Sequence, residues 1–180
     1  VNISQVFTRS GMTEISWKDS GITNIKQMKG KKVGVWCCGN ENELFAALVK
    51  NGLDPKKDVT IVNQPFDMNL FLQRKIDAAA AMTYNELAQV LETKNPETGK
   101  LYTLKDLNVI TMEKAGTAML EDGLYARGDW LKDKANQDIA KRFLAASFKG
   151  WAFCRDNVKA CTSIVLKNGP TLGAGHQLWQ

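Results

Sequence analysis

The stretch Lys31-Lys-Val-Gly-Val-Trp-Cys-Cys-Gly-Asn-Glu-Asn-Glu-Leu-Phe45 reads as a strand, a tight glycine loop and the start of a helix. Val33 and Val35 are β-branched residues in a short apolar run, which predicts a buried strand. Gly34 and Gly39 have no side chains to obstruct the close approach of another backbone. The stretch therefore predicts one strand–loop–helix unit of an α/β sheet.

The helix in this unit is predicted to begin at Asn40. Asn40 is a favoured N-cap residue, and Glu43 three positions later is placed to complete a capping box. The free N–H groups of the first turn would then point at the end of the strand, where open α/β sheets hold small polar ligands. A strand–turn–helix connection without a ligand is the alternative. The apolar face of the helix would comprise Leu44, Phe45, Leu48 and Val49.

Composition excludes several classes of protein. Of the 180 residues, 44% are hydrophobic and 24% are charged, which is typical of a folded domain. The net charge of +5 is spread over scattered lysines without an aromatic and arginine stripe, so nucleic-acid binding is not favoured. No run is long and apolar enough to span a bilayer. The sequence starts at Val1 without a signal-peptide pattern, and we expect a piece of a longer chain.

Four cysteines fall in two pairs. Cys154 and Cys161 flank a predicted corner between two helices, where a disulfide is geometrically possible and would fit an oxidising compartment. Two buried thiols are the alternative. For the adjacent Cys37 and Cys38 we expect free thiols. The cysteine spacing matches no zinc site and His176 is the only histidine, so no metal is expected.

Apolar patterning predicts alternating strands and helices. Short helices should begin near Asp67 and at Thr83 or Asn85. A long helix from residue 136 to 153 should place Ile139, Phe143, Leu144 and Phe148 on its core face, and another should run over 157–166. The order predicts an α/β fold with a largely parallel sheet. Strands are expected at 1–7, 12–17, 31–35, 59–62, 76–81, 109–112 and 119–126.

The order of elements also suggests a division into lobes. Several strand–helix units lie between two extended segments, Met12–Trp17 and Met119–Ala126. If these two segments cross as a pair, residues 27–115 form one α/β lobe. The two ends of the chain would then belong to a second lobe that is only partly present.

Several stretches of the sequence resemble a known family. Ser10-Gly-Met-Thr-Glu-Ile-Ser-Trp-Lys-Asp-Ser-Gly21, followed by Gly30-Lys-Lys-Val-Gly-Val35, resembles the passage between lobes in bilobal solute-binding proteins of ABC importers. Phe66-Asp-Met-Asn-Leu-Phe-Leu72 and Ile76-Asp-Ala-Ala-Ala-Ala-Met-Thr-Tyr-Asn-Glu86 are similar to the group that binds thiamin-pyrimidine precursors. Alkanesulfonate, nitrate and taurine binders are wider relatives.

The last stretch is Arg142-Phe-Leu-Ala-Ala-Ser-Phe-Lys-Gly-Trp151 with Cys154-Arg-Asp-Asn157, which resembles the closing helices of that group. The resemblance implies a type II periplasmic-binding-protein-like α/β fold with one complete lobe and part of the second. It implies the end of the first lobe and a crossover strand at 1–26, the second lobe at 27–115, and a return crossover with closing helices at 116–180.

The resemblance also implies a function. Such a protein closes about a hinge on a small ligand in an interlobe cleft and delivers it to a membrane permease outside the cytoplasm. It is not an enzyme and needs no cofactor. The ligand implied is a heterocycle similar to a thiamin precursor, and a sulfonate or nitrate anion is the alternative.

The implied cleft residues follow predicted strands. A planar ring could stack on Trp36 or Tyr84, and Glu86 could accept a hydrogen bond from an exocyclic amine. Helix N-termini at Asn40 and Asn85 would instead suit an anion. The predicted ligand-binding set is Arg9, Ser10, Gly11, Trp36, Gly39, Asn40, Glu41, Phe66, Asp67, Tyr84, Asn85 and Glu86.

Structural roles are the alternatives for several of these residues. Trp36 could belong to the core, and Asp67 could be a plain N-cap. Glu41 and Glu86 could satisfy helix N-termini, and Arg9 could be a surface residue.

A second class of protein with this fold is the fungal enzymes that make the thiamin pyrimidine. These use a cysteine-rich motif, a histidine, pyridoxal phosphate and iron. Cys37 and Cys38 lie in a different loop from that motif, His176 lies near the end of the chain, and no lysine stands in a Schiff-base context. The enzyme interpretation is therefore the less favoured one.

Overall fold

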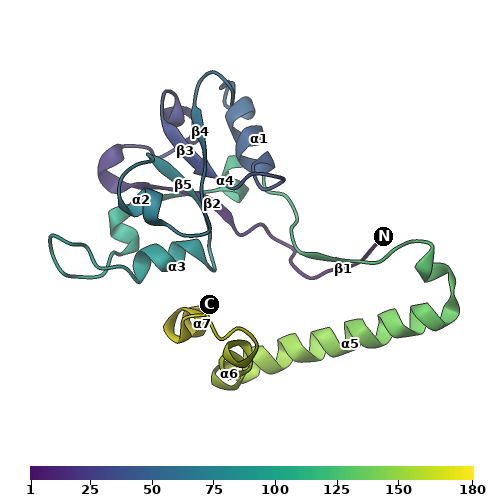
Figure 1. Cartoon of the computed structure of the whole chain (residues 1–180). Coiled ribbons are helices and arrows are strands. Elements are labelled where there is room, and N and C mark those ends of the chain that lie inside the picture. The colour runs from purple at the N-terminus through teal and green to yellow at the C-terminus, as the bar shows by residue number, and fades with distance from the viewer. The chain divides into compact units, whose positions relative to one another are not determined.

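The centre of the fold is a five-stranded sheet in the order β4-β3-β5-β2-β6 (Figure 1). The computed structural model describes all residues, 1–180. Strands β4, β3 and β5 are parallel, whereas β2 lies antiparallel between β5 and β6. The strands are β2 (Met12–Trp17), β3 (Lys32–Val35), β4 (Thr60–Asn63), β5 (Ala78–Met82) and β6 (Leu107–Thr111).

The α/β class is confirmed, and the sheet is largely parallel as expected, because β4, β3, β5 and β6 run in one direction and β2 alone runs against them. All six residues of β2 are buried, so the strand is enclosed on both of its faces. A strand of that kind belongs in the middle of a sheet, and its pattern carries no information about its direction. The direction of β2 is set by its neighbours, which makes the sheet mixed.

Helices cover both faces of this sheet (Figure 1). Helix α1 (Asn42–Lys50) and helix α4 (Met112–Ala115) pack with Val33, Val35 and Ala80 on one face. Helix α2 (Asn69–Leu72) and helix α3 (Glu86–Leu91) pack on the other face. Short 3-10 helices lie at Lys18–Ser20, Ile25–Met28 and Leu104–Asp106.

Trp17 anchors the second of these cores. Its ring stacks on Phe71 with centroids 4.6 Å apart, and its indole N–H donates to the Phe71 carbonyl. The guanidinium of Arg74 lies 5.0 Å from the Trp17 ring. With a helical layer and an apolar core on each face of the sheet, the larger unit is a three-layer α/β structure.

The predicted capping box at Asn40 is wrong. Helix α1 begins at Asn42, and its N-cap residue Glu41 makes no side-chain cap bond. Asn40 lies in an exposed turn, and Val49 is exposed rather than on the apolar face. The carboxylate of Glu43 does not reach back along the helix because it binds groups from distant parts of the chain.

The chain divides into two units, residues 9–119 and residues 1–8 with 120–180. The two segments Met12–Trp17 and Met119–Ala126, considered above as a crossing pair, are not hydrogen-bonded to each other, because β2 is inside the five-stranded sheet. Strand β7 (Gly123–Tyr125) instead pairs antiparallel with β1 (Asn2–Gln5). β2 therefore lies within the larger unit.

Three helices form most of the smaller unit: α5 (Lys134–Asp156), α6 (Val158–Asn168) and α7 (Ala174–Trp179). The carboxylate of Asp133 accepts the N–H of Ala135 and caps α5. Trp130–Lys132 is a short 3-10 helix before it. Sequence patterning did not predict α7. None of the helices has the length and apolar content needed to cross a membrane.

The face of α5 that was predicted to be a core face is exposed. Ala140 is the one buried residue of the helix, and Phe143 keeps 57% of its surface exposed. The amphipathic pattern is present, but no element of the smaller unit covers it. The exposed side chains include Ile139, Phe143, Phe148 and Trp151, and Leu144 is half-buried.

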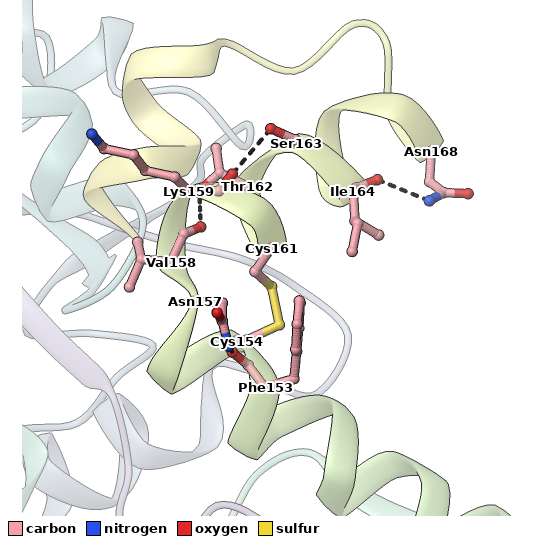
Figure 2. The surroundings of a disulfide bond; sticks show 10 residues. All are labelled: Phe153, Cys154, Asn157, Val158, Lys159, Cys161, Thr162, Ser163, Ile164 and Asn168. Atoms are coloured by element: carbon pink, nitrogen blue, oxygen red, sulfur yellow. Dashed lines mark hydrogen bonds between the residues drawn. A yellow bond between two sulfur atoms is a disulfide. The ribbon is translucent and has the colours of Figure 1, made fainter.

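A disulfide joins Cys154 near the end of α5 to Cys161 in α6, at the corner where the sequence predicted one (Figure 2). Their Cα atoms are 5.0 Å apart, within the range that a disulfide requires. The Asn157 side chain donates to the Phe153 carbonyl and so ends α5 rather than capping α6.

Candidate functional site

The twelve predicted ligand-binding residues all lie at one edge of the five-stranded sheet. The parallel strands β3, β4 and β5 end there. Strand β2 begins there because Met12 pairs with Met82, and β6 ends there because Thr111 pairs with Thr13. The loops at this edge are 9–11, 36–41, 64–68, 83–85 and 116–119. This is the carboxyl edge, at which open α/β sheets place their ligands.

The Ser10 side chain at this edge is hydrogen-bonded to Glu43, which the sequence predicted to complete a capping box. Its hydroxyl donates to Glu43 Oε2 at 3.0 Å and accepts the N–H of Met12. The other carboxylate oxygen of Glu43 accepts the N–H of Met119. Burial raises the pKa of Glu43, and the bonds from Met119 and Ser10 oppose that rise. Glu43 thus ties α1 to both ends of the larger unit.

Trp36 lies in the core, one of the two roles left open for it. Only 5% of its surface is exposed, and it packs with residues of α1 and β3. Its indole N–H donates to the Pro65 carbonyl at 3.3 Å, which joins the loops after β3 and β4. In this arrangement Trp36 packs under the loops of the carboxyl edge, and its ring has no exposed face on which a ligand could stack.

The loop that follows Trp36 is closed by a bond that was not expected. Cys37 and Cys38 form a disulfide instead of two free thiols. Cys38 has a φ of 74°, in the left-handed region, and this turn of the backbone places the adjacent sulfurs together. The N–H of Cys37 donates to the Asn63 side chain, so the loop is also tied to β4.

Glu41 binds its own loop. Its carboxylate accepts the N–H of Gly39 at 2.7 Å. This bond is the main cause of the lowered pKa of Glu41, with the N–H groups of Glu41 and Cys38 adding to it. The Asn42 side chain donates to the Gly39 carbonyl at 2.7 Å. The N–H groups of this loop therefore face a carboxylate, while Asn40 is exposed beside them.

Glu86 is buried and bonded within its own turn. Its carboxylate accepts the Met82 N–H at 3.0 Å and the Asn85 side-chain amide at 2.8 Å. Asn85 precedes α3 but makes no side-chain cap bond. These contacts give Glu86 a structural role, but its donors are the end of β5 and the Asn85 side chain rather than the first N–H groups of α3.

Two aromatic rings at the edge remain open to solvent. Tyr84 is 39% exposed and Phe66 is 79% exposed. The Tyr84 ring lies against the backbone of Gly11, where an added Cβ would come within 2.7 Å of its Cε1 atom. Gly11 accepts the Thr83 N–H through its carbonyl, which holds the two loops together. Glycine at position 11 thus makes room for the Tyr84 ring.

The remaining predicted residues have local roles or are exposed. The carboxylate of Asp67 accepts the Asn69 N–H at 2.8 Å, but the N-cap residue of α2 is Met68, so Asp67 lies one residue before the cap position that was the alternative for it. Arg9 is exposed. The sequence analysis did not single out Gln64, which is buried and exchanges two hydrogen bonds with the Ala80 backbone. Gln64 anchors the loop that carries Phe66 to β5.

Glu14 in the middle of β2 was also missed. It is fully buried on the α1 side of the sheet, and neither carboxylate oxygen has a hydrogen-bond partner. Burial raises the pKa of its carboxyl well above the usual 4.5. The alternation of β2 does predict an inward side chain at this position, but not that it lacks a partner. No three His, Cys, Asp or Glu side chains are grouped to hold a metal ion.

Comparison with solved structures finds the same fold. The periplasmic aliphatic sulphonate binding protein SsuA from Escherichia coli matches with a TM-score of 0.68 and 20% identity, over 92% of this chain and 49% of that one. The alkanesulfonate-binding protein SsuA from Xanthomonas axonopodis pv. citri, bound to MOPS, matches with a TM-score of 0.59 and 16% identity, over 94% and 54%. The chain therefore spans about half the length of these proteins.

Comparison with curated proteins gave no match. A family model described as NMT1/THI5 like matches residues 1–160. This match covers most of the sequence, including every predicted ligand-binding residue and the Cys37–Cys38 disulfide. The chain belongs to the NMT1/THI5-like family.

Proposed function

We propose that this chain is part of the solute-binding component of an ABC importer, which captures a small ligand by hinge closure and is not an enzyme. Membership of the NMT1/THI5-like family and the fold shared with two sulfonate-binding proteins support this proposal. The partner would be a membrane permease, and the site of action the periplasm or another extracytoplasmic space. Two disulfides fit an oxidising compartment of that kind.

The observation that carries the proposal is the pair of open rings at the carboxyl edge. Phe66 and Tyr84 come from the loops after β4 and β5, and both rings are accessible. A planar heterocycle similar to a thiamin precursor could stack on such rings, which are otherwise costly to leave in water. Glu41 is a half-buried acid at the same edge, and its carboxylate could accept a hydrogen bond from an amine of the ligand.

A sulfonate or nitrate ligand is the second candidate. The observation in its favour is the loop at 38–41, whose N–H groups already bind an anionic group, the carboxylate of Glu41. An anion would have to displace that carboxylate. An aminopyrimidine would leave it in place, and we therefore favour the heterocycle.

A thermal-shift experiment tests the proposal. The chain would be mixed with an aminopyrimidine, a short alkanesulfonate, nitrate, taurine or pyridoxal phosphate. A ligand at 100 times its dissociation constant stabilises the folded state by ~2.7 kcal/mol, enough to raise the melting temperature measurably. We expect the aminopyrimidine to raise it, and Phe66→Ala and Tyr84→Ala each to reduce the rise.

The matched control is Leu104→Ala. Leu104 is an exposed apolar residue just before β6, at the opposite edge of the sheet, so its loss should leave the rise unchanged. A shift with the sulfonate alone would move the proposal to the anion. Schiff-base absorbance with pyridoxal phosphate would favour the enzyme, and no shift with any compound would refute binding by this chain.

A further inference from the structure

The disulfide between Cys37 and Cys38 lies within the loop that the proposed site uses. Both residues are exposed, so a reductant in solution can reach the sulfurs. The other disulfide, Cys154–Cys161, lies in the other unit and joins two helices. The Cys154–Cys161 disulfide thus joins two helices, whereas the Cys37–Cys38 disulfide constrains a single peptide unit at the carboxyl edge of the sheet.

This constraint acts on the backbone directly. Adjacent half-cystines close a small ring that contains the peptide bond between them, so the bond limits the dihedral angles of both residues. Cys38 has a φ of 74°, a region that L-residues other than Asn and Asp rarely adopt. Once the ring is opened, Cys38 is free to return to negative φ, and the chain after it must turn in another direction.

The groups that would move are those of the proposed site. The N–H of Gly39 directly follows Cys38 and donates to Glu41 at 2.7 Å, and the N–H of Cys38 also acts on that carboxylate. On the N-terminal side of the disulfide, the N–H of Cys37 donates to the side-chain oxygen of Asn63. A change of φ at Cys38 therefore leaves the β3 side of the loop in place and redirects the α1 side.

We propose that the Cys37–Cys38 disulfide is a redox switch that holds the 36–41 loop in its ligand-binding form. A dithiol reductant would supply two electrons and two protons. The S–S bond breaks, each sulfur becomes a thiol, and the reductant is left as a disulfide. The reduced loop loses the Gly39–Glu41 bond and binds ligand more weakly. The effect on ligand rests on the proposed function, whereas the change in the loop does not.

The test uses the whole chain carrying Cys154→Ser and Cys161→Ser, so that the vicinal disulfide is the one that responds. Amide hydrogen exchange is followed before and after treatment with dithiothreitol. We expect exchange at Cys38 and Gly39 to become ~10-fold faster on reduction, because the protecting bond to Glu41 is lost. Amides of β5 should be unchanged. Adding Cys37→Ser and Cys38→Ser should give the fast rate at once and remove the response.

Equal exchange in the oxidised and reduced protein would overturn the switch, whatever the ligand result. The second arm measures the affinity of the aminopyrimidine, or of the sulfonate if that is the compound that binds. Reduction should weaken it ~10-fold, within the usual range of coupling between two sites. If neither compound binds, the proposed function fails while the exchange result still decides the switch. If reduction changes the amide exchange of the loop but leaves the affinity for the ligand unchanged, the proposal that the disulfide controls ligand binding is overturned.

Discussion

Glu14 illustrates how a single residue can oppose the fold that contains it. It sits between β5 and β6, paired in register with Ala80 and Ile110, and it is fully buried. Neither oxygen has a partner, so burial acts on the carboxyl without compensation. The folded protein therefore holds Glu14 in its protonated form at pH values where the unfolded chain has released the proton.

This imbalance predicts a dependence of stability on pH. Because the folded pKa of Glu14 lies above 4.5, the folded state binds more protons and stability falls as pH rises above that value. Glu14→Gln cannot ionise. We expect the unfolding free energy of the wild type to fall between pH 5 and pH 8, and that of the variant to fall less, by ~1–3 kcal/mol. Urea unfolding at both pH values measures this.

A residual slope is expected in the variant because burial also raises the pKa of Glu43. Parallel curves for the wild type and Glu14→Gln would show that Glu14 is not buried without a partner. At the proposed site, by contrast, the carboxylates of Glu41 and Glu86 both accept hydrogen bonds. Both carboxylates therefore have hydrogen-bond donors from their own loops, unlike that of Glu14.

At the scale of elements, close packing between β3 and its neighbours depends on small residues. Gly34 in β3 faces Ile76 and Gln64, and β5 contributes a run of alanines from Ala78 to Ala81. A Cβ at Gly34 would lie 2.6 Å from Ile76 Cδ1 and 2.7 Å from Gln64 Oε1. The same glutamine anchors the loop after β4, so packing and loop position are linked.

Gly34→Ala is therefore expected to destabilise the protein by ~1–3 kcal/mol, the usual cost of overpacking a core. Chemical denaturation measures the loss. The matched control is Gly150→Ala in α5, where an added Cβ meets nothing within 4 Å and the helix should gain slightly. A neutral result at Gly34 would mean that Gln64 and Ile76 move aside without cost.

For the whole molecule, the two units differ in how well they bury their apolar residues. The larger unit has a core on each face of its sheet. In the smaller unit the ring of Phe7 meets Trp151 edge-on at 5.8 Å, yet Trp151 and much of the α5 face stay exposed. Contiguous apolar surface of this kind promotes association between molecules.

We expect the isolated chain to self-associate through α5. Sedimentation velocity over a range of concentrations should show species larger than the 20.0 kDa monomer. Phe143→Glu should shift the distribution toward monomer, because it places a charge in the middle of the apolar face. Tyr125→Glu, at an exposed position in β7, is the control and should have no such effect. A monomer at all concentrations would contradict the prediction.

The sequence by itself determined the alternation of strands and helices, the membership of the family and the edge at which the predicted site residues gather. These features follow from the local pattern of apolar residues and from the positions where strands end, and both depend only on residues close together in the sequence. The tertiary structure alone decided the antiparallel direction of β2, the disulfide at Cys37–Cys38, and the partners of Glu43. The partner of Glu43 at Met119 lies 76 residues away, and such a contact depends on the order of strands in the sheet. A local pattern cannot specify which distant group will arrive beside a buried carboxylate, nor whether an apolar helix face such as that of α5 will be covered.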